Sequence, residues 1–207
     1  MFPSLTRLRR SPSPMAVKSV EGPGASGAAS PAQHQLHEDA QALLERAGII
    51  ENAIAAVLSG ENEDDPFNRL VAATGLAPQA ANWLRAVYRY LRQTGVSYTI
   101  YTVVDALVAA PQVTRAMIDL FAARHDPTFA GDRDEAIAAA QSAFTRGLAK
   151  VTAINDDRLL RLYRAVIDAV LRTNAFAPAA AEALAFKLES AKVPGLPKPL
   201  PWREIFV

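Results

Sequence analysis

Hydrophobic residues recur at spacings of three and four along most of the chain from residue 33 onward. This spacing is the period of an amphipathic α-helix, because it gathers the apolar side chains on one face. The chain therefore predicts a mainly α protein, a multi-helix bundle in which each apolar stripe packs against other helices. The expected helices cover residues 33–47, 49–58, 67–74, 78–94, a segment that ends before Pro111, 111–124, 132–151 and 155–171.

Glycine, proline and capping residues set the expected ends of these helices. Gly48 is expected to end the first helix in a left-handed conformation. Asp65 followed by Pro66 is the pattern of an N-cap with proline at the first helical position, and Asn155, followed by two aspartates, predicts a second cap. Residues 96–104 have the β-branched and aromatic composition of a strand. They lead directly into helical spacing, so we expect a loop that feeds a helix.

The two ends of the chain depart from the helical pattern. Residues 1–32 are rich in serine, proline and glycine and predict a disordered leader, because they hold too few large apolar groups to offset chain entropy. Four prolines between residues 194 and 201 predict an extended segment without internal hydrogen bonds. The composition of residues 204–207 predicts a strand with no visible neighbour, whose exposed apolar groups would fray or aggregate. The expected organisation is a leader at 1–32, a helical domain at 33–175, a variable alanine-rich segment and proline-rich connector at 176–201, and an orphan β-strand at 202–207.

Composition and charge narrow the classes of function. The chain of 207 residues has 22 basic and 21 acidic residues, so its net charge of +1 gives no drive toward nucleic acid or an anionic membrane. The leader holds four of the basic residues and one acidic residue, which leaves 18 basic and 20 acidic residues from residue 31 onward. The absence of cysteine excludes disulfides and thiolate sites. No uncharged stretch approaches the roughly 20 apolar residues of a spanning helix. The expected location is cytoplasmic.

The histidines are the first candidates for chemistry. His34 and His37 are three residues apart with Glu38 beside them, a geometry that suits two metal ligands on one helical face. They lack a third ligand nearby and border the leader, so a solvated first helical turn is the favoured interpretation. His125 stands beside Asp126 and Pro127, which favours a helix end over a general base.

Three charged clusters are further candidates, and none of them carries a motif. Arg85, Arg89 and Arg92 follow one helix beside aromatic residues, which suits RNA in principle, but the mildly acidic body favours a solvated face or a contact with another domain. A second set of arginines has the same interpretation, with Arg164 placed to pair with Asp168: Arg158, Arg161, Arg164 and Arg172. An acidic cluster without the spacing of a calcium loop is interpreted as a loop and helix cap: Glu61, Glu63, Asp64 and Asp65.

No motif for phosphate binding, dinucleotide binding or nucleophilic catalysis is present in the chain. The residues themselves therefore predict no catalytic, cofactor-binding or metal-binding residue. They indicate a helical module without visible catalytic machinery.

Several segments, taken in order, resemble the large NAD-specific glutamate dehydrogenases of bacteria. The similar segments are 64–71 (DDPFNRLV), 84–95 (LRAVYRYLRQTG), 156–161 (DDRLLR), 171–174 (LRTN), 186–190 (FKLES), 193–199 (VPGLPKP) and 203–207 (REIFV). The resemblance covers about residues 48–207, and the ordered set is more specific than any single segment. Residues 1–35 do not match, and the alanine-rich 175–185 departs from the family pattern.

The resemblance implies that this chain is the helical region immediately upstream of the catalytic domain, with its last strand opening that domain. The parent enzyme would oxidise L-glutamate to 2-oxoglutarate and ammonia with NAD, and this chain alone would be inactive because the catalytic and NAD-binding residues lie beyond residue 207. The expected partners are the catalytic dehydrogenase domain or chain and other copies of the parent in a homo-oligomer, with no nucleic acid and no membrane. The alternative is a free-standing helical interaction module without catalysis.

Overall fold

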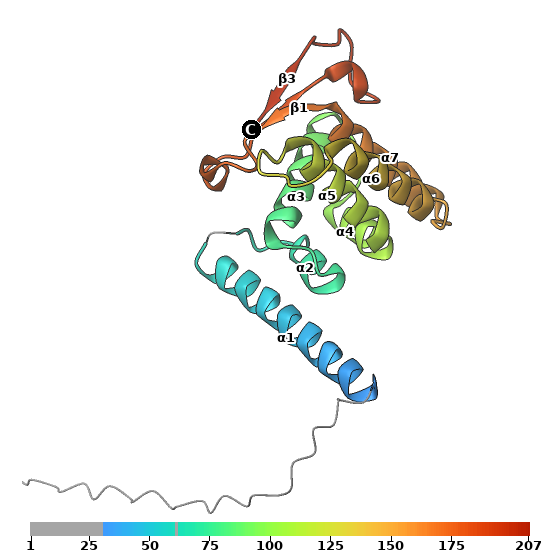
Figure 1. The fold of residues 1–207 in the computed structure, drawn as a ribbon. Coiled ribbons are helices and arrows are strands. Elements are labelled where there is room, and N and C mark those ends of the chain that lie inside the picture. The colour runs from blue at the N-terminus through green and yellow to red at the C-terminus, as the bar shows by residue number, and fades with distance from the viewer. Residues whose placement is uncertain (1–30, 61) are drawn as a thin grey trace, which may run out of the picture. The chain divides into compact units, whose positions relative to one another are not determined.

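The structure of the chain is a computed structural model that describes residues 31–60 and 62–207. The described part is mainly helical, as expected, and its helices lie in the order shown in Figure 1. Their bounds are α1 Pro31–Leu58, α2 Asn68–Thr74, α3 Pro78–Gln93, α4 Ile100–Ala109, α5 Pro111–His125, α6 Arg133–Leu148 and α7 Ile154–Ala169, with short 3-10 turns at Pro178–Ala181 and Ser190–Lys192.

A small antiparallel sheet follows the last helix. Strand β1 is Val170–Thr173, β2 is Phe186–Leu188 and β3 is Glu204–Phe206, and they lie in the order β1-β2-β3. Phe186 pairs with Phe206 and with Thr173, so these residues share one end of the sheet. Because side chains alternate along a strand, Phe186 and Phe206 face the core while Ile205 faces solvent.

The sequence explains where most helices begin and end. Thr99 and Asp132 cap α4 and α6, because their side chains accept hydrogen bonds from the backbone N–H groups of Thr102 at 3.2 Å and Glu135 at 3.0 Å. Gly75 ends α2 with φ at 69°, a conformation that glycine adopts without strain. The expected loop before α4 is confirmed, since helix begins only at Ile100.

Four expected helix boundaries are wrong, one of which is the start of α2, where Phe67 and not Asp65 is the N-cap. Gly48 does not end a helix, since α1 runs through it to Leu58 and no side chain crowds the position. The N-cap of α7 is Ala153 and not Asn155, because the helix begins at Ile154. The same helix ends at Ala169, so the expected helix to residue 171 instead passes directly into β1 (Figure 1).

The prediction of an orphan strand is also wrong, because β3 pairs with β2 within the chain. The local sequence pattern does not predict the partner strands, because β1 continues the apolar stripe of α7 and β2 is only three residues long. Strand β2 lies inside the segment expected to be a connector. The expected leader falls outside the described residues except for residues 31 and 32, which are helical.

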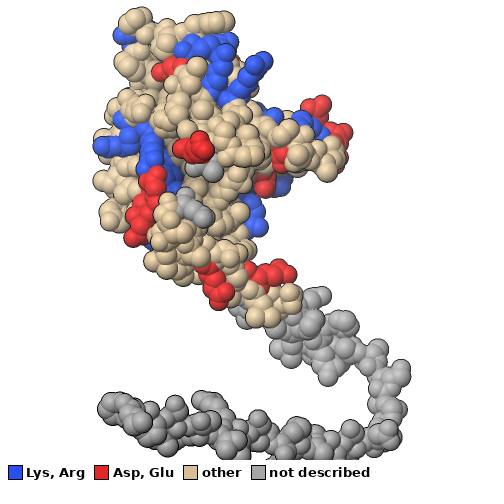
Figure 2. Space-filling model, turned by 90° about the vertical axis from the view of Figure 1, so that its left-hand side faces the viewer, with Lys and Arg blue, Asp and Glu red and all other residues tan. Residues whose placement is uncertain are grey.

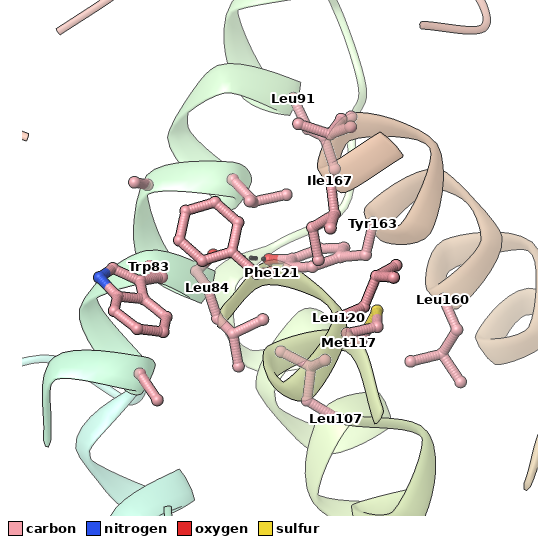
Figure 3. Close-up of a cluster of buried hydrophobic side chains, with 14 of the residues drawn as sticks. Trp83, Leu84, Leu91, Leu107, Met117, Leu120, Phe121, Leu160, Tyr163 and Ile167 are labelled. Atoms are coloured by element: carbon pink, nitrogen blue, oxygen red, sulfur yellow. Dashed lines mark hydrogen bonds between the residues drawn. The ribbon is translucent and has the colours of Figure 1, made fainter. Parts of the chain in front are cut away.

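Residues 39–207 form one compact unit around a shared hydrophobic core. Figure 3 shows side chains from α3, α5 and α7 converging, among them Leu84, Phe121 and Tyr163. Tyr163 is fully buried, and its hydroxyl donates a 3.3 Å hydrogen bond to the carbonyl oxygen of Leu84. Burial of this hydroxyl raises the pKa of Tyr163 well above its usual value.

Within the described ranges, no single helix is both long and apolar enough to cross a membrane. Helices α4 and α5 would pass such a test only together, and the chain bends by 97° between them.

Candidate functional site at the junction of the helices and the sheet

The histidine candidates do not form a described site. The side chains of His34, His37 and Glu38 lie outside the described residues, although their backbone belongs to α1. His125 is the last residue of α5, as expected, and its ring packs 5.0 Å from that of Phe121. Its Nε2 atom is buried without a hydrogen-bond partner. Burial, with the positive charges of neighbouring arginines, lowers the pKa of His125 to about 4.

The arginines of α3 do not form one solvated stripe. Arg85 is buried, and its guanidinium donates two hydrogen bonds to the carboxylate of Asp65 at 2.6 and 2.8 Å. Arg89 is half exposed and pairs with Glu63, while Arg92 is exposed. A continuous basic surface for RNA is therefore absent from this helix. Figure 2 likewise shows basic and acidic side chains beside one another on the face in view.

The acidic cluster before α2 supplies partners for these arginines. Asp65 also accepts a 2.9 Å hydrogen bond from the backbone N–H of Phe67, so it stabilises the turn before α2 and does not cap the helix as predicted. Glu61 lies outside the described residues. Among the described residues, no group of three histidine or acidic side chains is placed to hold a metal ion.

The predicted pair of Arg164 and Asp168 is confirmed at 2.7 Å. The second carboxylate oxygen of Asp168 accepts from Arg124 at 2.6 Å, which joins α5 to α7. Arg161 pairs with Asp157 at 2.8 Å, and both Arg158 and Arg172 are exposed.

A pocket of about 800 Å³ lies between α3 and the segment 175–184, beside the end of β3. On the α3 side, the amide of Asn82 donates to Asn62 at 2.8 Å, and that of Gln79 donates to the carbonyl oxygen of Ala175 at 3.0 Å. The lining comprises Asn62, Glu63, Gln79, Asn82, Trp83, Arg85, Ala86, Arg89, Ala175, Ala177, Pro178, Ala180, Glu182, Ala183, Leu184, Phe206 and Val207. The sequence analysis missed this pocket, although the alanine-rich segment that forms one wall was visible as a departure in composition.

Aromatic rings and one hydrogen bond join α3 to α5, to the segment after β1 and to strand β3. The ring of Trp83 lies 4.9 Å from that of Phe121 and 5.0 Å from that of Phe176. The ring of Tyr90 lies 5.9 Å from that of Phe206, and its hydroxyl donates a 2.6 Å hydrogen bond to Glu204 on β3. Burial first, and then the hydrogen bond and charge of Glu204, raises the pKa of Tyr90 above its usual value.

These contacts hold α3 against neighbouring segments of the chain. The charged side chains Arg85 and Arg89 of the pocket are each engaged with a carboxylate. No serine or threonine lines it as a nucleophile. The arrangement is a packed junction with an adjoining pocket.

Two family models match the chain on either side of this junction. Residues 62–127 match the model described as glutamate dehydrogenase, helical motif 3, and residues 143–207 match bacterial NAD-glutamate dehydrogenase, catalytic domain. The second match begins well before residue 202, where the sequence analysis placed the start of the catalytic domain. It includes α7 and the whole sheet.

Curated relatives agree with these matches. The chain is 36% identical over 172 residues to the NAD-specific glutamate dehydrogenase of Halomonas elongata, 34% over 166 residues to that of Pseudomonas aeruginosa and 35% over 161 residues to that of Mycobacterium tuberculosis. These alignments cover 80%, 77% and 75% of this chain and 10% of each relative. The resemblance found in the sequence is confirmed: residues 62–127 and 143–207 carry two segments of the bacterial NAD-specific glutamate dehydrogenase family.

Proposed function

We propose that this chain is a segment of an NAD-dependent glutamate dehydrogenase and that it supplies a helical, non-catalytic scaffold to that enzyme. The parent would convert L-glutamate, NAD and water to 2-oxoglutarate, ammonia and NADH. Its catalytic and NAD-binding residues would lie outside this chain, which alone would be inactive. The expected cytoplasmic location and the partnership with a catalytic domain belong to the same proposal.

The observation that carries this proposal is the core shared by the two family segments. Tyr163 of the second segment is buried against Leu84 of the first, and Phe121 of the first lies 5.8 Å from Phe186 of the second. Such close packing holds the two segments in a fixed arrangement, because protein interiors are dense and resist deformation. A helical region built in this way would fix the sheet from which a catalytic domain extends.

The alternative, a free-standing interaction module, has one observation in its favour. Helix α1 exposes the large apolar side chains of Leu44, Ile54 and Leu58, and Ile54 and Leu58 also line a groove of about 340 Å³ between α1 and α2. Exposed apolar groups that cluster in this way often mark a protein contact. Such a module would need no further dehydrogenase domain.

Replacement of a segment in a relative tests the proposal. The matched segment of the Pseudomonas aeruginosa dehydrogenase is exchanged for the aligned residues of this chain, and NAD reduction with glutamate is measured in the chimera and in purified residues 1–207. The expected result is an active chimera and no activity from the isolated chain. A control chimera carries an unrelated helical bundle of equal length and should be inactive.

Two outcomes would contradict the proposal. Activity of residues 1–207 alone would show that the chain holds its own catalytic machinery. A chimera that folds, as judged by a cooperative thermal transition, but does not oxidise glutamate would show that this chain cannot take the place of the dehydrogenase segment.

A further inference from the structure

The pocket beside α3 adjoins the C-terminal end of strand β3. Phe206 of β3 and the following residue, Val207, line it together with Trp83 and Ala177. In the described part of the chain, β3 is the last strand in the order β1-β2-β3, so one of its edges has no neighbouring strand. An edge of this kind presents backbone N–H and C=O groups that can pair with another extended segment.

The chemistry of the pocket suits a neutral polypeptide better than an ion. Its α3 wall carries the side-chain amides of Gln79 and Asn82, which are already hydrogen-bonded to neighbouring residues of the chain. The charges of Arg85 and Arg89 are each engaged by a carboxylate. The facing wall consists largely of alanine, whose small side chains leave room for larger ones from a bound segment.

Large apolar side chains are exposed around β3. Trp202, Ile205 and Val207 are 82%, 74% and 71% exposed, which is unfavourable for large apolar groups so close together. The catalytic-domain match includes β3, and the relatives are about ten times longer than the aligned part.

We propose that this pocket receives an extended segment of dehydrogenase polypeptide, namely the residues that follow the matched region in the relatives. The inference rests on the proposed function and adds a partner and a place to it. The bound segment runs on from the end of β3, passes between α3 and residues 177–183, and covers Val207. Part of its backbone pairs with the free edge of β3.

A peptide titration tests this binding on the complete chain. The chain has two tryptophans, so Trp202→Phe leaves Trp83, in the pocket wall, as the single fluorophore. The probe is a synthetic peptide of the 20 residues that follow the matched region in the Pseudomonas aeruginosa relative. Because the contact is intramolecular in a long enzyme, weak binding is expected, with saturation of the Trp83 signal below about 1 mM peptide.

Matched variants decide where the peptide binds. Ala177→Phe and Ala183→Phe fill the pocket from exposed positions, whereas Ala138→Phe adds the same group at an exposed position on α6. Both pocket variants should weaken peptide binding by about tenfold or more, because the added ring occupies the space that the peptide needs, and the α6 variant should not.

Three results would overturn the inference: no saturation at 1 mM, equal binding of a shuffled peptide, or binding that the pocket variants leave unchanged. The chimera described above distinguishes this failure from failure of the proposed function. An active chimera whose peptide does not bind residues 1–207 would overturn the docking site alone. A folded, inactive chimera together with specific peptide binding would overturn the dehydrogenase role and leave a polypeptide-binding pocket.

Discussion

Arg85 is a buried cation that the fold accommodates by surrounding it with acceptors. Its side chain is 5% exposed, and besides the two bonds to Asp65 it donates to Asn82 and, at 3.2 Å, to Asn68. The guanidinium also lies 5.7 Å from the ring centre of Phe67. A charge so placed contributes little net stability while paired, but loss of its partner leaves an uncompensated charge in the interior.

Replacement of Arg85 by methionine should therefore destabilise the protein strongly. Arg85→Met leaves the carboxylate of Asp65 without its cation, and we expect the free energy of unfolding in urea to fall by about 3 kcal/mol. Arg69→Met is the matched control, because the pair of Arg69 and Asp105 is 54% and 61% exposed and should contribute less than about 1 kcal/mol. Equal effects of the two substitutions would show that Arg85 is not held as described.

His125 should make the stability of the protein depend on acidity below neutral pH. Its pKa is about 4 when folded and 6.5 in its usual state, so the unfolded chain binds a proton that the folded chain does not accept. The contribution of His125 to the free energy of unfolding is then fully present above pH 6.5, and it is lost as the pH is lowered toward 4. We expect His125→Phe, which keeps a ring beside Phe121 and removes the unpaired Nε2, to flatten this dependence in chemical denaturation. A parallel decline in both proteins would contradict the prediction.

At the scale of elements, the contact between α5 and α6 depends on a glycine. A Cβ atom added to Gly147 would lie 2.8 Å from Cγ2 of Val113, closer than real contacts allow. Gly147→Ala should lower the melting temperature, because overpacking costs about 1–3 kcal/mol and exceeds the gain in helix propensity of about 0.5–1 kcal/mol. Gly48→Ala meets no atom within 4 Å and should leave stability unchanged or raised. The same response at both positions would argue against this packing.

The sequence predicted the helices better than the strands for a physical reason. Amphipathic spacing over ten or more residues is a strong signal, and α3 to α6 follow it closely. Strand β2 offers three residues, too few for a period, and β1 extends the stripe of α7 without a break. Pairing between β2 and β3 depends on contacts between segments that no local pattern reveals.

The candidate site was less predictable than the fold. Its pocket combines residues of α3 with the segment 175–184, which are distant in the sequence. The burial of Arg85 had a weak signal, because α3 carries apolar residues on both sides of it and Asp65 stands in the loop before α2. Helical spacing alone could not show which of Arg85, Arg89 and Arg92 would face inward.

At the scale of the whole molecule, Tyr90 joins the two regions that match separate family models. It lies in α3, within the helical-motif match, and its hydroxyl donates to Glu204 of β3, within the catalytic-domain match. The hydrogen bond supplements an edge-on contact between the rings of Tyr90 and Phe206. Loss of the hydroxyl should thus loosen the sheet without disturbing the helical core.

Tyr90→Phe should lower the free energy of unfolding by about 1–2 kcal/mol at pH 7, because the partly buried carboxylate of Glu204 loses its donor. The folded pKa of Tyr90 is raised above its usual value of 10, so its contribution is complete below pH 10. Above pH 10 the unfolded chain ionises first and the contribution declines, and the difference between the two proteins should narrow.

Tyr101→Phe, at a side chain that is 64% exposed, is the control and should behave as the unaltered chain. If the difference caused by Tyr90→Phe were absent at pH 7, or widened above pH 10, the hydrogen bond would not couple the helices to the sheet. Hydrogen exchange at residues 204–206 would locate the effect, since faster exchange there with unchanged exchange in α5 is expected only if the bond holds β3 in place.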